Sequence, residues 1–338
     1  MRRVLLLALV FLTACSLPSD DPSSVHDLRI LAIQTTPPEL RYPVHGNYQL
    51  EQCDPDLSAI AGWSPIQLKA LVADPKGGGR NLSWIWTECP GTGTERCPDD
   101  PAYVIATGNG PPSQIAATFD VVGEALAEEQ TEASCDGGCP PTPLFTTFAD
   151  DPLGFCRFGV WQQIGLEVDT PDAGSIWGST LMVFTPVPDD YPTDGGCPLG
   201  PDGGMPPHDN PEFSVLELDG NPLPVSGVVN APAGVSHTMT PVIPSDGEQP
   251  YCVPNFQGGW TNLTETWLFS LMTTVGSFSQ EQVGAGGFAN LQGGQINLTV
   301  NWSTPGDGGA ATIYSVVRDG RGGTSWITRD VDLQPAGP

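Results

Sequence analysis

The histidines are the first candidates for catalysis, because imidazole serves both as a metal ligand and as a general base near neutral pH. The chain has four, His26, His45, His208 and His237, and none shows the paired spacing of a zinc hydrolase such as H-E-x-x-H. There is no G-x-S-x-G nucleophile elbow, and Ser236 beside His237 is no evidence for a triad, whose members meet through the fold. We interpret the histidines as loop residues and expect no enzyme, no metal and no cofactor.

Eight of the nine cysteines form an even set that suits disulfide bonds. The close spacing of Cys135 with Cys139, and of Cys89 with Cys97, would also fit zinc ligands. No histidine lies near either pair, and the Asp-Gly-Gly sequence between Cys135 and Cys139 suits a tight loop. We therefore expect disulfides, formed in an oxidising compartment. The candidates are Cys53, Cys89, Cys97, Cys135, Cys139, Cys156, Cys197 and Cys252.

Aspartate-rich turns are candidate calcium ligands, because Ca²⁺ prefers carboxylate and carbonyl oxygens. No D-x-D-x-D-G loop with a distal glutamate is present, so calcium binding stays open. The glycine-rich residues 76–80 and 286–287 lack the strand-to-helix context of a phosphate loop, and we interpret them as ordinary loops. The aspartate turns are Asp99-Asp100, Asp150-Asp151, Asp189-Asp190 and Asp307-Gly308-Gly309.

Nine tryptophans raise the alternative of a carbohydrate-binding module, in which exposed rings stack on sugar faces. Trp84 and Trp86 fall on one side of a predicted strand. Trp302 and Trp326 would also share one side of a sheet if their predicted strands pair. Such positions favour the core of a β-sandwich. The carbohydrate alternative instead predicts three or more exposed Trp or Tyr rings in one plane.

The charge balance excludes whole classes of partner. The chain has 39 acidic and 12 basic residues and a net charge of −27. Nucleic acids and anionic lipid head groups need clustered Lys and Arg, so neither is an expected partner. The acidic surface favours solubility. A length of 338 residues allows two or three domains, and 41 Gly with 36 Pro indicate long loops between ordered elements.

The first residues read as an export signal. Arg2 and Arg3 precede the apolar residues 4–12, a stretch too short for a permanent membrane helix. Leu12-Thr13-Ala14-Cys15 follows and resembles the lipobox of bacterial lipoproteins. That resemblance implies that residues 1–14 are removed and that Cys15 carries a diacylglyceryl thioether and an N-acyl chain. Several acyl chains anchor a protein stably in a membrane.

Residues 15–26 contain Ser, Pro and Asp without apolar periodicity and predict a flexible tether. Residue 16 is Ser rather than Asp, which in the enterobacterial sorting rule favours the outer membrane. We therefore expect a lipid-anchored protein of a Gram-negative outer membrane, facing the periplasm or the surface.

The remaining chain predicts two β-sandwiches, at residues 27–190 and 212–334, joined by a linker at 191–211 that has no apolar run. Alternating and apolar segments bounded by Gly, Pro and Asp predict the strands, with hairpins at 66–72/82–87, 160–168/179–184 and 312–317/324–331. One short helix is expected at 122–130. The other expected strands lie at 28–33, 115–122, 213–218, 237–243, 266–274 and 295–302.

Several turn-rich segments resemble sequences recurrent in uncharacterised surface lipoproteins of myxobacteria, which carry immunoglobulin-like domains. They are residues 28–38, residues 71–75 leading into Trp84-Ile85-Trp86, and residues 317–323 with Trp326. The resemblance implies an all-β fold of tandem immunoglobulin-like sandwiches, and it supplies no activity to carry over. We therefore expect a non-enzymatic envelope lipoprotein that acts in adhesion or envelope assembly, with carbohydrate binding as the alternative.

Overall fold

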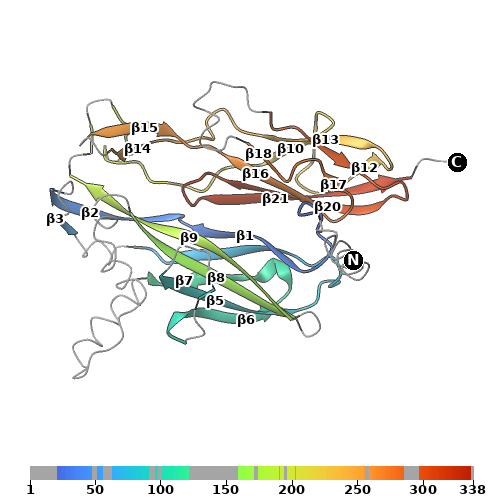
Figure 1. Cartoon of the computed structure of the whole chain (residues 1–338), viewed down its shortest axis with the longest axis horizontal. Helices are drawn as coiled ribbons and strands as arrows, with labels where there is room; N and C mark the ends of the chain where they lie inside the picture. Colours follow the sequence, from blue (N-terminus) through green and yellow to red (C-terminus); the bar gives the residue numbers. More distant parts are fainter. Residues whose placement is uncertain are drawn as a thin grey trace, which may run out of the picture.

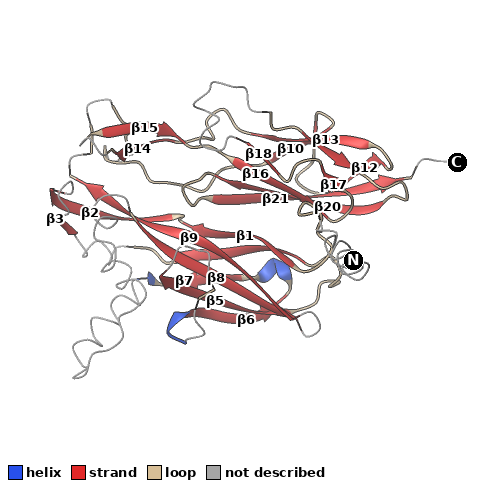
Figure 2. Ribbon diagram, in the orientation of Figure 1, coloured by secondary structure: helices blue, strands red, loops and turns tan. Residues whose placement is uncertain are grey.

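The chain is all β in every part that the structure describes. Its described residues form strands and two single-turn 3-10 helices, η3 (Pro101–Tyr103) and η4 (Pro112–Gln114) (Figure 2). None of their helices has the length and apolar character needed to cross a membrane. This computed structural model describes residues 21–47, 52–55, 63–90, 96–97, 101–121, 159–170, 174–189, 191–193, 196–201, 203–255, 259–284 and 297–335.

The first half of the chain forms a sandwich of two sheets (Figure 1). One sheet has the strand order β1-β4-β7, and the other has the order β3-β2-β9-β8-β5-β6. The strands are β1 (Arg29–Thr36), β2 (Glu39–Asn47), β3 (Gln52–Pro55), β4 (Ile66–Ala73), β5 (Leu82–Pro90), β6 (Val104–Gly110), β7 (Ala116–Phe119), β8 (Val160–Thr170) and β9 (Gly174–Pro188).

The second half forms another sandwich, with sheets ordered β11-β10-β13-β19-β17 and β12-β21-β20-β16-β18, and a separate hairpin β14-β15. The strands are β10 (Val215–Leu218), β11 (Asn221–Pro222), β12 (Val228–Pro232), β13 (Ser236–Val242), β14 (Pro250–Pro254), β15 (Trp260–Thr264), β16 (Leu268–Thr273), β17 (Ser277–Phe278), β18 (Gln282–Gly284), β19 (Val300–Ser303), β20 (Gly309–Arg318) and β21 (Thr324–Gln334).

Both sandwiches follow one immunoglobulin-like plan. In each, an early strand crosses to the opposite sheet and runs parallel to the last strand, as β2 does beside β9 and β12 beside β21. The last strand then pairs with the strand before it, and that strand pairs with β5 in the first sandwich and β16 in the second. The strand order confirms the prediction of tandem immunoglobulin-like sandwiches.

Alternation along the strands builds the two cores. In β4, Ile66 and Leu68 are fully buried while Gln67 and Lys69 are exposed, because successive side chains point to opposite faces. Trp86 fills the first core and Trp302 the second, both at 0% exposure, as expected from the sequence. Trp84 packs at the edge of the first core, whereas Trp326 packs between the sandwiches.

The sandwiches pack face to face, as Figure 1 shows for β1 against β20 and β21. Leu31, Ala73, Met272 and Val316 form a third apolar layer between them. Because side chains alternate, Val316 lies in this layer while Val317 lies in the second core. The amide of Gln34 donates a hydrogen bond across the junction to the carbonyl of Thr324 at 2.6 Å, so the two halves form one body of four sheets.

An N-terminal strap, residues 21–25, attaches to the second sandwich before the chain enters the first. The backbone amide of Val25 donates to the carbonyl of Thr273, and the amide of Thr273 donates to the carbonyl of Ser23, both at 2.8 Å. The hydroxyl of Ser23 also accepts the amide of Phe278 at 2.9 Å. These residues belong to the segment expected to be a tether. Residues 1–20, which contain the predicted signal and Cys15, lie outside the described residues.

Two of the three predicted hairpins are confirmed, because β8 pairs with β9 and β20 with β21. The hairpin predicted at 66–72/82–87 is wrong. Its strands, β4 and β5, lie in opposite sheets of the first sandwich. Both direct apolar side chains into the same core, so their sequences could not distinguish pairing within a sheet from packing across the sandwich. The helix expected at 122–130 lies outside the described residues.

Candidate functional site

The linker between the sandwiches packs against the β14-β15 hairpin. Cys197 of the linker forms a disulfide with Cys252 of β14. Around it lie Tyr191 and Met205, and the Tyr191 ring meets Trp260 edge-on with 5.1 Å between the ring centroids. This small apolar cluster holds the linker down and brings residues 205–212 against both sandwiches.

Beside this hairpin, ionisable side chains from four segments meet in the interior. We call Glu39, His208, Glu265, Asp319 and Arg321 the junction cluster. Glu39 begins β2, His208 comes from the linker, Glu265 stands between β15 and β16, and Asp319 and Arg321 lie in the β20-β21 turn. His208 is 1% exposed, and Glu265 and Asp319 are each 2% exposed.

The turn between β20 and β21 fixes Asp319. One carboxylate oxygen, Oδ1, accepts the backbone amides of Arg321 at 2.8 Å and Gly323 at 3.0 Å. Gly320 has φ +77°, a conformation that L side chains rarely adopt, so the turn requires glycine there. The other oxygen, Oδ2, lies 2.7 Å from Nε2 of His208.

Glu265 is held in the same way. Its Oε2 accepts the backbone amide of Gln249 at 3.2 Å, and its Oε1 lies 2.9 Å from Nη1 of Arg321 and 3.5 Å from Nε2 of His208. Burial raises the pKa of Glu265 above its ordinary value, and the nearby charge of Asp319 raises it further.

Arg321 and Glu39 complete the cluster. The Arg321 guanidinium lies 4.3 Å from the centre of the Tyr251 ring, a cation-π contact, and its Nη2 lies 3.8 Å from Oε2 of Glu39. Glu39 also accepts the backbone amide of His208 and the hydroxyl of Thr185, each at 2.9 Å. Glu39 thereby joins the first sandwich to the linker and to the turn of the second.

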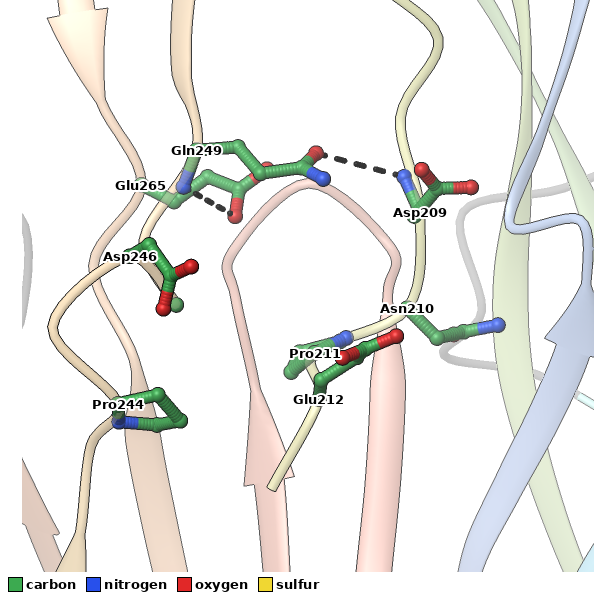
Figure 3. A pocket seen from close by; sticks show the side chains of 9 residues that line it. Asp209, Asn210, Pro211, Glu212, Pro244, Asp246, Gln249 and Glu265 are labelled. Atoms are coloured by element: carbon green, nitrogen blue, oxygen red, sulfur yellow. Dashed lines mark hydrogen bonds between the residues drawn. The ribbon is translucent and has the colours of Figure 1, made fainter.

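A cavity of about 470 Å³ opens beside the cluster (Figure 3). Its wall includes four carboxylates, Asp209, Glu212, Asp246 and Glu265. The Gln249 side chain accepts a hydrogen bond from the amide of Asp209 at 3.4 Å, which links the linker to the hairpin across the cavity. The cavity is therefore polar and negative, a setting that suits cations and disfavours anionic ligands.

The expectation that all four histidines are loop residues is wrong for two of them. His45 lies in β2, where its Nδ1 is 2.8 Å from Asp189, and His237 lies buried in β13, where its Nδ1 is 2.7 Å from Asp219. His26 lies in an exposed loop, and His208 lies in a loop but is buried. The Asp-Gly-Arg-Gly-Gly sequence at 319–323 predicted a turn. Its two charged residues, Asp319 and Arg321, were not recognised as members of a site.

Among the candidate cysteines whose side chains the structure describes, Cys89 pairs with Cys97 and Cys197 with Cys252, so zinc binding by Cys89 and Cys97 does not apply. Cys53 lies in β3. Cys135, Cys139 and Cys156, with the Asp99-Asp100 and Asp150-Asp151 turns, lie outside the described residues.

Within the described residues, neither Asp189 nor Asp307 belongs to a group of three that could hold a metal. Among the described residues, His208, Glu265 and Asp319 are the group of three whose ligand atoms lie within 4.8 Å of one another. Among the aromatic side chains that the structure describes, Trp161 is the exposed one, at 42%.

No protein-family model and no curated protein matches the chain. Solved structures align weakly along most of it. Activated α-2-macroglobulin from Escherichia coli aligns over 94% of this chain and 23% of its own, with 8% identity and a TM-score of 0.22. Murine CEACAM1b aligns over 92% and 100%, with 8% identity and a TM-score of 0.18. A Bacteroides ovatus glucan-utilisation protein, SGBP-B, aligns over 80% and 64%, with 11% identity and a TM-score of 0.15. Similarity at this level carries no argument about function.

Proposed function

We propose that this protein is a lipid-anchored, non-enzymatic recognition module of the bacterial outer membrane, acting in adhesion or envelope assembly. The observation that supports this proposal is the packing of two immunoglobulin-like sandwiches into one body through a buried apolar layer. A rigid body holds its surface loops in fixed positions, which lowers the entropy cost of binding a partner. The lipobox at Cys15 supplies the anchor, so the folded part needs no membrane-binding surface.

The arrangement of the junction cluster supports a structural role over turnover. Asp319 and Glu265 each bond a backbone amide, and both are almost fully buried. Such burial and backbone anchoring suit a junction that holds two domains together.

Exposed apolar side chains indicate where a partner binds. Val225, Val228 and Val235 are 80%, 61% and 46% exposed and lie within eleven residues along the edge strand β12 and its flanking loops. Exposed apolar surface on a free sheet edge is typical of protein-binding sites. We assign the partner surface to this edge segment, residues 225–235, and the partner to a protein.

The anchor is tested by mass spectrometry and fractionation of cells that produce the wild type or Cys15→Ala. We expect an acylated Cys15 as the mature N-terminus in the outer-membrane fraction, and a released Cys15→Ala protein. An unmodified residue 15 in the membrane fraction would remove the lipid anchor from the proposal.

The partner surface is tested by site-specific photo-crosslinking from position 228 in intact cells. We expect one discrete adduct that Val225→Lys abolishes. Crosslinking from position 104 is the matched control, since Val104 is also exposed, at 39%, and lies on the edge strand β6 of the first sandwich. Equal adducts from both positions, or none from 228, would contradict this surface.

Carbohydrate binding is the alternative, and Trp161 is the ring from which it can be tested. Affinity electrophoresis in gels that contain envelope glycans should show retardation that Trp161→Ala removes if this alternative holds. Unchanged migration of both proteins would count against it.

A further inference from the structure

We propose that the junction cluster binds one divalent transition-metal ion, best matched by Zn²⁺, through His208, Glu265 and Asp319. Three protein ligands and one water make a common tetrahedral zinc site. The inference goes beyond the proposed recognition role, and it stands or falls independently of the lipid anchor and of the partner surface.

The ligand atoms already lie close together. Nε2 of His208 is 2.7 Å from Oδ2 of Asp319 and 3.5 Å from Oε1 of Glu265, and the three atoms fit within 4.8 Å. Zinc bonds of about 2.0–2.2 Å in a tetrahedron separate neighbouring ligands by about 3.3 Å. Seating the ion would therefore require Nε2 of His208 and Oδ2 of Asp319 to separate from 2.7 Å to about 3.3 Å, with their hydrogen bond replaced by two metal bonds.

Backbone amides orient the two carboxylate ligands. In Asp319 and Glu265, one oxygen accepts backbone amides while the other points to the imidazole. The backbone of His208 is fixed by its bond to Glu39. Such supporting contacts orient metal ligands and strengthen metal binding. The geometry is thus prepared by the fold and is not a chance meeting of mobile side chains.

The imidazole of His208 supplies an independent observation. The side chain is fully buried, and its Nδ1 has no hydrogen-bond partner among the described residues. Whichever tautomer is present, one ring nitrogen gains nothing from the protein, which costs about 1–3 kcal/mol. That cost falls on Nδ1, whereas the proposed metal bond is at Nε2, the nitrogen that faces both carboxylates.

A bound cation would suit the charge balance of the cluster. When ionised, Glu39, Glu265 and Asp319 carry three negative charges, and Arg321 supplies one positive charge. With a neutral imidazole, as metal binding requires, two charges remain unbalanced in the interior. One divalent ion would balance them while Arg321 keeps its bond to Glu265.

The acidic cavity supplies a path to the site. Glu265 belongs both to the cluster and to the cavity wall, where Asp209, Glu212 and Asp246 attract cations and leave room for the water ligand. A nitrogen ligand and only three protein ligands fit Zn²⁺ better than Ca²⁺ or Mg²⁺, which prefer six or more oxygen ligands.

The test is calorimetric titration of ZnCl₂ into the purified, fully oxidised protein without its signal peptide and with Cys15→Ala, after a thiol assay has shown that the other eight cysteines carry no free thiol. We expect one saturable site with a dissociation constant below millimolar Zn²⁺. His208→Gln and Glu265→Gln should each weaken binding by about 10–100-fold or more, by analogy with losses in metal sites. Ca²⁺ and Mg²⁺ should not compete.

His45→Gln is the matched control, because it removes an exposed histidine beside Asp189 and should leave the affinity unchanged. Circular dichroism checks that each variant folds. X-ray absorption of the wild-type zinc complex gives a second readout, with a first shell of nitrogen and oxygen and one imidazole expected. The proposal is overturned if no saturable site exists below millimolar Zn²⁺, if folded His208→Gln and Glu265→Gln bind as the wild type does, or if the shell contains sulfur.

Discussion

An ion pair in a loop of the first sandwich and the ion pairs of the junction cluster differ in how far along the chain they reach. In the first sandwich, the loop after β4 contains its own ion pair, in which Arg80 lies 2.8 Å from Asp74 across six residues of sequence. In the second sandwich, Arg321 meets Glu265 and Glu39, which come from distant segments and from the other sandwich. A local pair stabilises one loop, whereas the junction cluster stabilises the relation between two domains.

Among the substitutions that test this comparison, Arg321→Ala should have the largest effect on the free energy of unfolding. It leaves Glu265, Asp319 and Glu39 without their cation in a buried site and should lower the free energy of unfolding by about 3–5 kcal/mol. Arg80→Ala, the matched change in the first sandwich, also leaves a buried carboxylate without its cation, but only that of Asp74, and should therefore cost less. Urea unfolding of both variants measures the difference. Equal losses would mean that the junction cluster is no more important than a loop ion pair.

The two disulfides should also contribute unequally to stability, with the larger contribution again beside the junction cluster. Cys197–Cys252 closes a 55-residue separation and Cys89–Cys97 an 8-residue one. Replacing both cysteines of the longer bridge by Ala should cost about 2–4 kcal/mol, and the shorter bridge about 1.5 kcal/mol less, because loop-closure entropy grows with loop length. Thermal unfolding of the two double variants gives the ranking, and a larger loss for the Cys89 and Cys97 variant would reverse it.

Neighbouring valines of β20 test whether the sandwiches unfold together. Val316 and Val317 are both fully buried, the first between the sandwiches and the second inside one core. Each change to Ala should cost about 2 kcal/mol. In calorimetry we expect Val316→Ala to split unfolding into two transitions, whereas Val317→Ala should not. A single transition for Val316→Ala would show that the polar junction suffices for coupling.

The smallest expected effect concerns two histidine-aspartate pairs. Burial alone would raise the pKa of Asp219, but hydrogen bonds from His237 and Thr238 lower it overall. A carboxyl with a lowered folded-state pKa stabilises the protein above its ordinary value of 3.8, and this contribution is lost as pH falls below that value.

Asp219→Asn should therefore destabilise the protein at neutral pH and lose its effect in acid. Asn tolerates the φ of +50° at this position. Asp189→Asn, in the exposed pair with His45, should change stability little at any pH. Chemical unfolding from neutral to strongly acidic pH makes the comparison, and a pH-independent effect of Asp219→Asn would contradict this account.

Local patterns predicted much of the fold. Alternation and turn residues located most strands. The Asp-Gly-Arg-Gly-Gly turn predicted the β20-β21 hairpin, because a hairpin depends only on contacts between residues that are close in sequence. The sheet assignment of β4 and β5 could not be predicted, since both strands face one core. Trp86 and Trp302 were recognisable as core residues from their strand positions.

The junction cluster could not be predicted for a related reason. His208 and Asp319 are 111 residues apart, and Glu39 is 169 residues from His208, so no spacing rule links them. His208 stands in a Pro- and Gly-rich linker, a context typical of exposed loops. Only the docking of the linker between the sandwiches buries it.

The N-terminal strap determines where mechanical tension enters the molecule. Ser23 and Val25 bond Thr273 of the second sandwich, although the chain continues directly into β1 of the first. Tension on the chain ahead of residue 21 would therefore reach the second sandwich through these backbone hydrogen bonds. Because Val25 also packs with Leu31 in the apolar layer, the load would divide between both halves instead of entering the first sandwich alone.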